Sequence, residues 1–154
     1  MEISLEKQLA SDFDWFCVDD RGEVGHFAHA GFKKLPQSVA ASREDREFVT
    51  RFFNEELNRH RGHTVDPDLR NNVDNQGERY LHSFVAMADK GLYSFDIASY
   101  LKPKICYFRV ALPVQPIVLA ELPEKVQEIV NRTKLRTGSL SSLARIPYDV
   151  SLQM

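Results

Sequence analysis

The sequence has little of several features that mark specialised classes of protein. It contains only two cysteines in 154 residues, too few for a disulfide framework. No apolar run approaches the roughly 20 residues that a helix needs to cross a bilayer, and the first residues lack the pattern of a signal peptide. The formal net charge of −2 gives no broad basic field for nucleic acid. These absences predict a cytoplasmic protein without nucleic-acid or membrane partners.

Recognisable catalytic and cofactor motifs are also missing. There is no phosphate-binding glycine-rich loop, dinucleotide fingerprint, HExxH zinc pattern or EF-hand loop. Ser94 and Asp96 lie near the end of an expected strand, but no G-x-S-x-G elbow surrounds them. We therefore expect no cofactor, and the sequence favours a non-catalytic protein over an enzyme.

What is present is an ordinary globular composition, with 43% hydrophobic and 27% charged residues. A chain of this size buries roughly 68–70% of the surface that it exposes when unfolded, so it needs neither disulfides nor a metal for stability. We expect one domain over residues 1–133. The segment 134–154 is a C-terminal tail, either docked through its few apolar residues or disordered.

The stretch 14–29 predicts a β-hairpin, with strands at 14–18 and 23–29. Asp19 starts the turn by bonding its own backbone, and Gly22 supplies the positive φ that closes it. Apolar side chains occupy both faces of the first strand, so we expect it to be covered on both sides. Trp15 and Cys17 share one face, and Phe16 and Val18 share the other.

The rest of the chain predicts an α+β domain: a small, mostly antiparallel sheet packed with about three helices. Further strands are expected near 92–97 and 105–112, with a short edge strand at 117–119. The helices are expected at 43–60, 78–90 and 122–133. Ser42 can cap the first of these, with Asp45 three residues later in a capping-box arrangement.

Histidine and cysteine side chains give no convincing site. His26 and His29 are three residues apart on a strand and point to opposite faces, so they cannot share a metal ion. His60 and His63 lack a second ligand pair. Cys17 lies in an apolar strand, which raises a thiol pKa and hides the sulfur, so it is a poor nucleophile. We expect no metal, and we expect Cys17 and Cys106 to be free thiols rather than a disulfide.

A protein-binding surface is the better candidate. The polar loop 63–77 has a length typical of functional or mobile loops. Its acidic side chains, together with nearby aromatic ones, are suited to a basic protein partner. The predicted partner-binding residues are Asp66, Asp68, Asp74, Glu78, Tyr93 and Tyr100.

The patterns DWF-C-VDDRGEVGHFAHAGF, KGLYSFD at 90–96 and YFRVALP at 107–113 resemble those of a group of small bacterial proteins. These chains share a "DWF-x-VD-x-x-G" opening and a "YFRVALP" ending, and the resemblance covers roughly residues 12–133. In general character the group is similar to immunity proteins of bacterial toxin systems. The resemblance assigns no role to any individual residue.

Our leading hypothesis is therefore an immunity protein that neutralises a cognate toxin by protein–protein binding. The acidic residues of this chain would meet a basic surface on the toxin. One alternative is a small enzyme that uses His26, His29 or Asp96 in a cleft. Another is a structural or regulatory subunit that uses its apolar surface to form a homodimer. The sequence leaves open whether the chain is a monomer or a homodimer. A deep pocket with convergent titratable groups would favour the enzyme.

Overall fold

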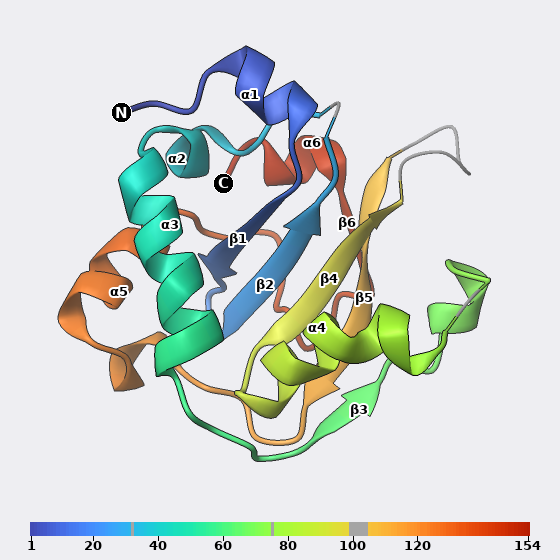
Figure 1. Ribbon diagram of the computed structural model, residues 1–154. Coiled ribbons are helices and arrows are strands. Elements are labelled where there is room, and N and C mark those ends of the chain that lie inside the picture. The colour runs from blue at the N-terminus through green and yellow to red at the C-terminus, as the bar shows by residue number, and fades with distance from the viewer. Residues whose placement is uncertain (32, 75, 99–104) are drawn as a thin grey trace.

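The computed structural model describes residues 1–31, 33–74, 76–98 and 105–154. A mixed sheet runs through the molecule in the order β1-β2-β4-β5-β3, and β6 pairs with one part of β5 (Figure 1). Its strands are β1 (Phe13–Val18), β2 (Val24–His29), β3 (His63–Val65), β4 (Tyr93–Ala98), β5 (Cys106–Pro113) and β6 (Arg145–Pro147).

The predicted hairpin is confirmed. β1 and β2 pair antiparallel, and Gly22 closes the turn with φ = 76°. One carboxylate oxygen of Asp19 accepts hydrogen bonds from the main-chain N–H groups of Arg21 and Glu23, as an Asx turn requires. Trp15 is 1% exposed and stacks on Phe27 at a ring-centroid distance of 4.2 Å. The hairpin is therefore held by its turn and by aromatic packing.

The α+β class is confirmed, with two refinements. β2 and β4 pair parallel, so the sheet is mixed. The part of the chain that the structure describes also contains three short α-helices, α1, α2 and α6, in addition to the three that were expected. The helices are α1 (Leu5–Ala10), α2 (Gln37–Ala40), α3 (Arg43–Arg51), α4 (Glu78–Asp89), α5 (Glu124–Val130) and α6 (Tyr148–Ser151).

The helix at Arg43 is shorter than the predicted range of 43–60. α3 ends at Arg51 and continues into a single π-helical turn, η1 (Phe52–Glu56), after which Leu57 is extended. The ammonium group of Lys90, at the end of α4, donates hydrogen bonds to the main-chain carbonyls of Phe53 and Asn54. A cation from a distant helix thus satisfies carbonyl groups that a longer helix would have used internally.

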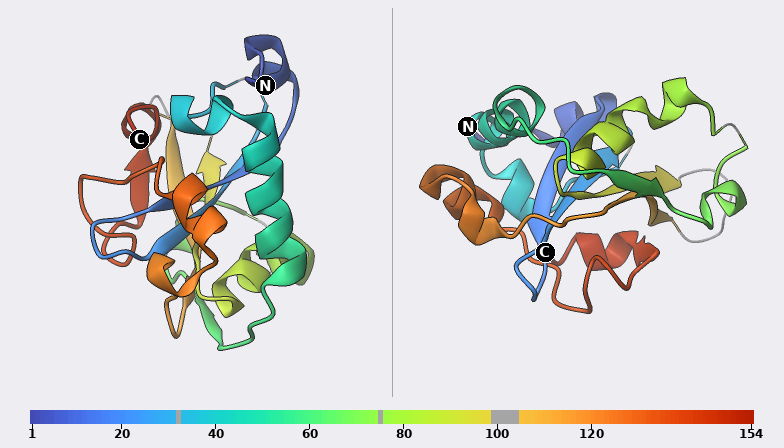
Figure 2. Two further views of the ribbon diagram at one scale, coloured as in Figure 1. Left: turned by 90° about the vertical axis from the view of Figure 1, so that its left-hand side faces the viewer. Right: turned by 90° about the horizontal axis from the view of Figure 1, so that it is seen from below.

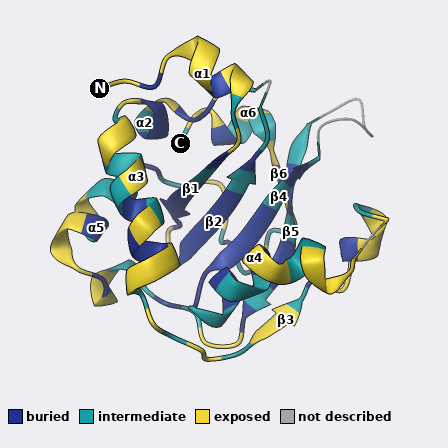
Figure 3. Cartoon of the chain, viewed as in Figure 1, coloured by how far each residue is buried: buried dark blue, intermediate teal, exposed yellow. Residues whose placement is uncertain are grey.

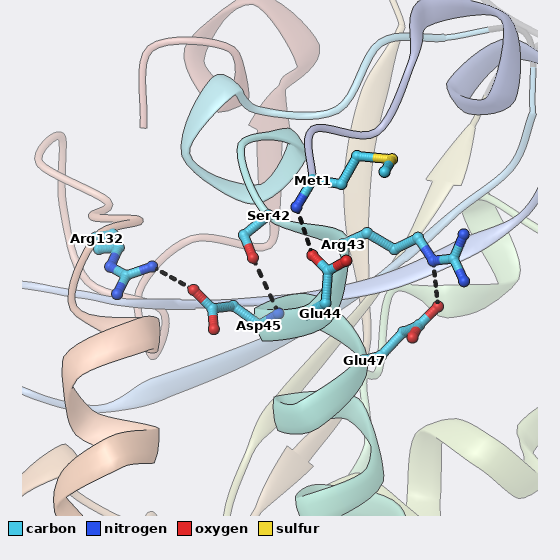
Figure 4. Close-up of polar contacts among 7 residues, drawn as sticks. All are labelled: Met1, Ser42, Arg43, Glu44, Asp45, Glu47 and Arg132. Atoms are coloured by element: carbon cyan, nitrogen blue, oxygen red, sulfur yellow. Dashed lines mark hydrogen bonds and ion pairs between the residues drawn. The ribbon is translucent and has the colours of Figure 1, made fainter.

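Polar contacts fix the start of α3 (Figure 4). Ser42 accepts a hydrogen bond from the Asp45 N–H at 3.1 Å, as predicted, but the Asp45 carboxylate does not complete a capping box. Instead it accepts a hydrogen bond from Arg132, just after α5, at 2.7 Å. The amino group of Met1 pairs with Glu44 at 2.6 Å. These contacts connect α3 to the N-terminus and to α5.

Two irregular regions differ from expectation. The loop 63–77 contains β3 and a 3₁₀ turn, η2 (Leu69–Asn71). The expected edge strand at 117–119 is reduced to a single bridge between Val118 and Glu23, followed by η3 (Leu119–Glu121). The last predicted helix is shorter and corresponds to α5. None of the helices in the described residues is both long and apolar enough to cross a membrane.

The C-terminal tail is docked on the sheet, on the side opposite to α3 and α4 (Figure 2, right). Leu135, Leu140 and Ile146 are at most 1% exposed and pack in the same cluster as Trp15. The second carboxylate oxygen of Asp19 accepts a hydrogen bond from the Leu140 N–H at 2.9 Å. The tail is thus part of the core of this domain.

Candidate functional site

Among the described residues, helices cover only part of one sheet face. α3, η1 and α5 pack on the lower half of β1 and β2, and α4 packs on β4 and β5 (Figure 1). Within β1, β2 and β4 only four positions are half-buried, and the others are buried. Figure 3 shows half-buried stretches at the upper ends of β2 and β4. The four positions are Asp14 on β1, Ala28 on β2, and Asp96 and Ala98 on β4.

Strand register places three of these positions in one row. Asp14 pairs with Ala28 across β1 and β2. The parallel register of β2 and β4 aligns Phe27 with Phe95, and one further step brings Ala28 beside Asp96. Neighbouring positions across a sheet share a face, so both carboxyl groups flank the small Ala28 side chain. The result is a hollow of about 240 Å³, which we call the Asp14–Asp96 hollow, lined by Asp12, Phe13, Asp14, Ala28, His29, Ala30 and Asp96.

His26 lies behind Asp14 in the next row of the same face. Its side chain is 2% exposed, and Nδ1 lies 2.7 Å from the hydroxyl oxygen of Ser94. Nε2 lies 3.1 Å from Asp14 Oδ1, at ion-pair distance but without a well-aligned hydrogen bond. A carboxylate accepts and does not donate, so the ring proton is expected at Nε2, and Nδ1 then accepts the Ser94 hydroxyl.

The two carboxyl groups of the hollow have different surroundings. Burial raises the pKa of Asp14, but the interaction with the neighbouring His26 ring, with a smaller effect from Arg46, outweighs burial and lowers the pKa overall. Burial raises the pKa of Asp96 overall, although Tyr80 and the Ile97 N–H donate to it at 2.7 and 2.8 Å. The hollow therefore combines a well-stabilised carboxylate with one that lacks an ion pair among the described residues.

This arrangement is better suited to binding than to nucleophilic attack. Ser94, His26 and Asp14 form a chain that looks like a Ser-His-Asp relay, but Ser94 is fully buried and cannot meet a substrate. The accessible groups are carboxylates: Asp14 and Asp96, and at the edge of the hollow the exposed Asp12, which accepts a hydrogen bond from the Gly31 N–H. Asp14 and Asp96 have oxygen lone pairs left to accept further hydrogen bonds. A cationic group placed between them would satisfy both.

The predicted partner-binding residues are divided by the structure. Asp68, Asp74 and Glu78 are exposed, on the segment that leads into α4. Tyr93 is 4% exposed, and burial raises the pKa of its phenol to about 12. Tyr93 is thus a core residue and cannot contact a partner in this structure. Tyr100 lies outside the described residues.

Asp66 also differs from the prediction, because it is buried. Its side chain is 3% exposed and pairs with Arg109 on β5, whose Nε donates to Oδ2 at 2.8 Å. The same guanidinium donates to the main-chain carbonyls of Leu140 and Ser141 at 2.9 and 2.8 Å. Asp66 therefore connects the loop after β3 to the tail through Arg109, and its role is structural.

The remaining candidate groups have local partners. His29 lies on the face opposite to His26, as predicted, with Nδ1 2.9 Å from the Tyr107 hydroxyl. His63 pairs with Asp89 at 2.7 Å. Cys17 and Cys106 are free, and burial raises the Cys17 thiol pKa. Within the described ranges, no three His, Cys, Asp or Glu side chains gather closely enough to hold a metal ion.

Sequence reasoning considered Asp96 but missed Asp14. Asp14 is the one charged residue within the apolar strand β1, and this interruption is the signal that could have identified it. Comparison with protein-family models, curated proteins and solved structures returned no match. The assignment of function therefore depends on the site itself.

Proposed function

We propose that the protein is a non-catalytic binding protein of the immunity type, which neutralises a toxin by binding a basic surface on it. The observation that carries the proposal is the half-buried Asp96 carboxylate on an uncovered sheet face. Its donors are the neutral Tyr80 hydroxyl and Ile97 N–H. Burying a carboxylate without a cation is unfavourable, and a cation from a partner would remove that penalty.

The exposed acidic residues would add to the charge that a basic partner meets. Glu78 begins α4, the helix from which the Tyr80 hydroxyl donates a hydrogen bond to Asp96. Asp68 and Asp74 precede it, while the exposed Arg70 and Arg79 give the segment a mixed polar rim. Complementary charge accelerates encounter and fixes orientation, as an inhibitor requires.

Association kinetics with the product of the neighbouring gene, as the candidate toxin, would test the proposal. The triple variant Asp68→Lys, Asp74→Lys, Glu78→Lys should associate about tenfold more slowly and with weaker salt dependence, because exposed charges act through steering. Its melting temperature should stay close to that of the wild type.

A matched control triple changes exposed carboxylates elsewhere and should associate at the wild-type rate: Asp20→Lys, Glu124→Lys and Asp149→Lys. Stopped-flow fluorescence at two salt concentrations separates the two triples. Equal association rates for both would contradict the proposed surface, and no binding to the adjacent gene product would contradict the immunity role.

A second candidate function, acid–base catalysis in the Asp14–Asp96 hollow, is favoured by one observation. The pKa of Asp14 is lowered and that of Asp96 is raised, which is how a base and an acid are distinguished in two-carboxylate enzymes. Turnover of a chromogenic ester, phosphoester or glycoside that disappears in Asp96→Asn would favour this function over binding alone.

A further inference from the structure

The Asp14–Asp96 hollow has the features of a receptor for one particular chemical group. Both carboxylates have partners behind them: Asp96 accepts hydrogen bonds from Tyr80 and Ile97, and Asp14 lies 3.1 Å from His26 Nε2. Their remaining lone pairs are available to a ligand in the hollow. Asp96, which two donors already hold, loses little freedom on binding, and this favours affinity.

His26 shows that the Asp14 carboxylate is not yet optimally oriented in the free protein. The ring is buried, and its Nε2 lacks a well-aligned hydrogen bond although Asp14 lies 3.1 Å away. A buried polar atom without a hydrogen bond costs about 1–3 kcal/mol. A donor that holds Asp14 from the hollow side would fix the carboxylate plane and allow Oδ1 to align with Nε2.

The shape of the hollow indicates which cation fits. Asp14 and Asp96 lie on strands separated by one intervening strand, so their Cα atoms are about 10 Å apart. An ammonium group is a compact point charge, whereas a guanidinium is a planar fork with five N–H donors that can bridge separated carboxylates. A metal ion is disfavoured, because the described residues offer no group of three suitable ligands.

The nearest arginine of the chain does not fill this role. The Arg46 guanidinium lies over the Phe13 ring at 4.9 Å, and its Nη1 lies 3.4 Å from the main-chain carbonyl of Asp14, not from the carboxylate. Its charge still acts on Asp14. Arg46 therefore occupies the outer side of β1 and leaves the hollow side of both carboxylates available.

We propose that the Asp14–Asp96 hollow binds the guanidinium group of an arginine side chain presented by the partner protein. This inference rests on the proposed function for the nature of the partner. Beyond the proposed function, it specifies the chemical group that is recognised and the residues that recognise it. Asp14 and Asp96 accept the guanidinium N–H groups, and Ala28 provides the floor that lets the planar group enter.

The test needs no partner protein. Wild-type protein is titrated with N-acetyl-arginine N-methylamide and followed by two-dimensional ¹H–¹⁵N NMR. Saturable shifts are expected at the amides around Asp14, Ala28 and Asp96. The neutral citrulline analogue and the lysine analogue should bind at least about tenfold more weakly, since charge-assisted bidentate hydrogen bonds are lost. Equal shifts with all three analogues, or none with arginine, would overturn the proposal.

Variants localise the binding. Asp14→Asn and Asp96→Asn nearly preserve shape, and each should weaken arginine-analogue binding about tenfold. Asp20→Asn, at the far end of the hairpin, should leave it unchanged. An unchanged affinity in Asp96→Asn would also overturn the proposal. Because wild-type selectivity is measured separately, a variant that fails to fold leaves the test intact. A failed partner-association experiment would count against the immunity role and not against arginine binding.

Discussion

Replacing Arg109 by methionine should destabilise the fold strongly. The Arg109 side chain is 11% exposed, and its guanidinium is the cationic partner of the buried Asp66 carboxylate. Methionine keeps much of the aliphatic volume but removes the charge and the donors to the Leu140 and Ser141 carbonyls. The buried Asp66 carboxylate would then lack its counter-charge, which is the most unfavourable consequence of the change.

The magnitude follows from this geometry. Removing one member of a buried, hydrogen-bonded ion pair costs about 3–5 kcal/mol, whereas an exposed pair contributes about 0–1 kcal/mol. For a domain of this size, a loss of 3–5 kcal/mol lowers the melting temperature by roughly 6–20 °C. Arg43→Met is the matched control. Arg43 pairs with Glu47 at 3.1 Å, and their side chains are 60% and 51% exposed.

Urea unfolding and thermal melting, both followed by circular dichroism, would measure these effects. Asp66→Asn alone should destabilise less than Arg109→Met, because the guanidinium keeps both carbonyl acceptors. The double variant should lose less stability than the sum of the single variants, since the two side chains interact directly. If the free energy of unfolding of Arg109→Met were within about 1 kcal/mol of the wild-type value, the structural role given to Asp66 would be wrong.

Two further predictions concern the hairpin. Trp15→Ala should cost about 3–5 kcal/mol in urea unfolding, because it deletes a fully buried aromatic side chain, and an unchanged midpoint would contradict its place in the core. The folded-state pKa of Asp14 is lowered, so its contribution to stability is present above its unfolded pKa, near 4, and is lost as pH falls through the folded pKa. The stability advantage of wild type over Asp14→Asn should therefore shrink below about pH 4, and an advantage that is constant from pH 7 to pH 2 would refute the assignment.

Local features were predictable from the sequence, and long-range ones were not. The hairpin follows from a turn signal and from apolar side chains on both faces of its first strand, and α4 follows from its periodicity. The end of α3 depends on Lys90, which lies 37 residues after the carbonyl that it binds. The fate of Asp66 depends on Arg109, which is 43 residues away. No local pattern encodes such pairings.

The candidate site was only partly predictable for the same reason. Asp14 and Asp96 come together because β2 and β4 pair in parallel, and this pairing is set by the packing of the intervening helices. Acidic composition correctly identified exposed carboxylates in Asp68, Asp74 and Glu78. It could not distinguish them from Asp66, since burial depends on tertiary contacts.

The docked tail also determines when the protein can fold during synthesis. Leu135, Leu140 and Ile146 cover the face of the sheet that carries Trp15, and β6 pairs with β5. While these residues remain inside the ribosomal exit tunnel, that aromatic face has no cover and the emerging chain exposes it. Completion of the domain therefore waits until these residues have left the tunnel. During that interval the nascent chain is a natural client for chaperones that recognise apolar surfaces.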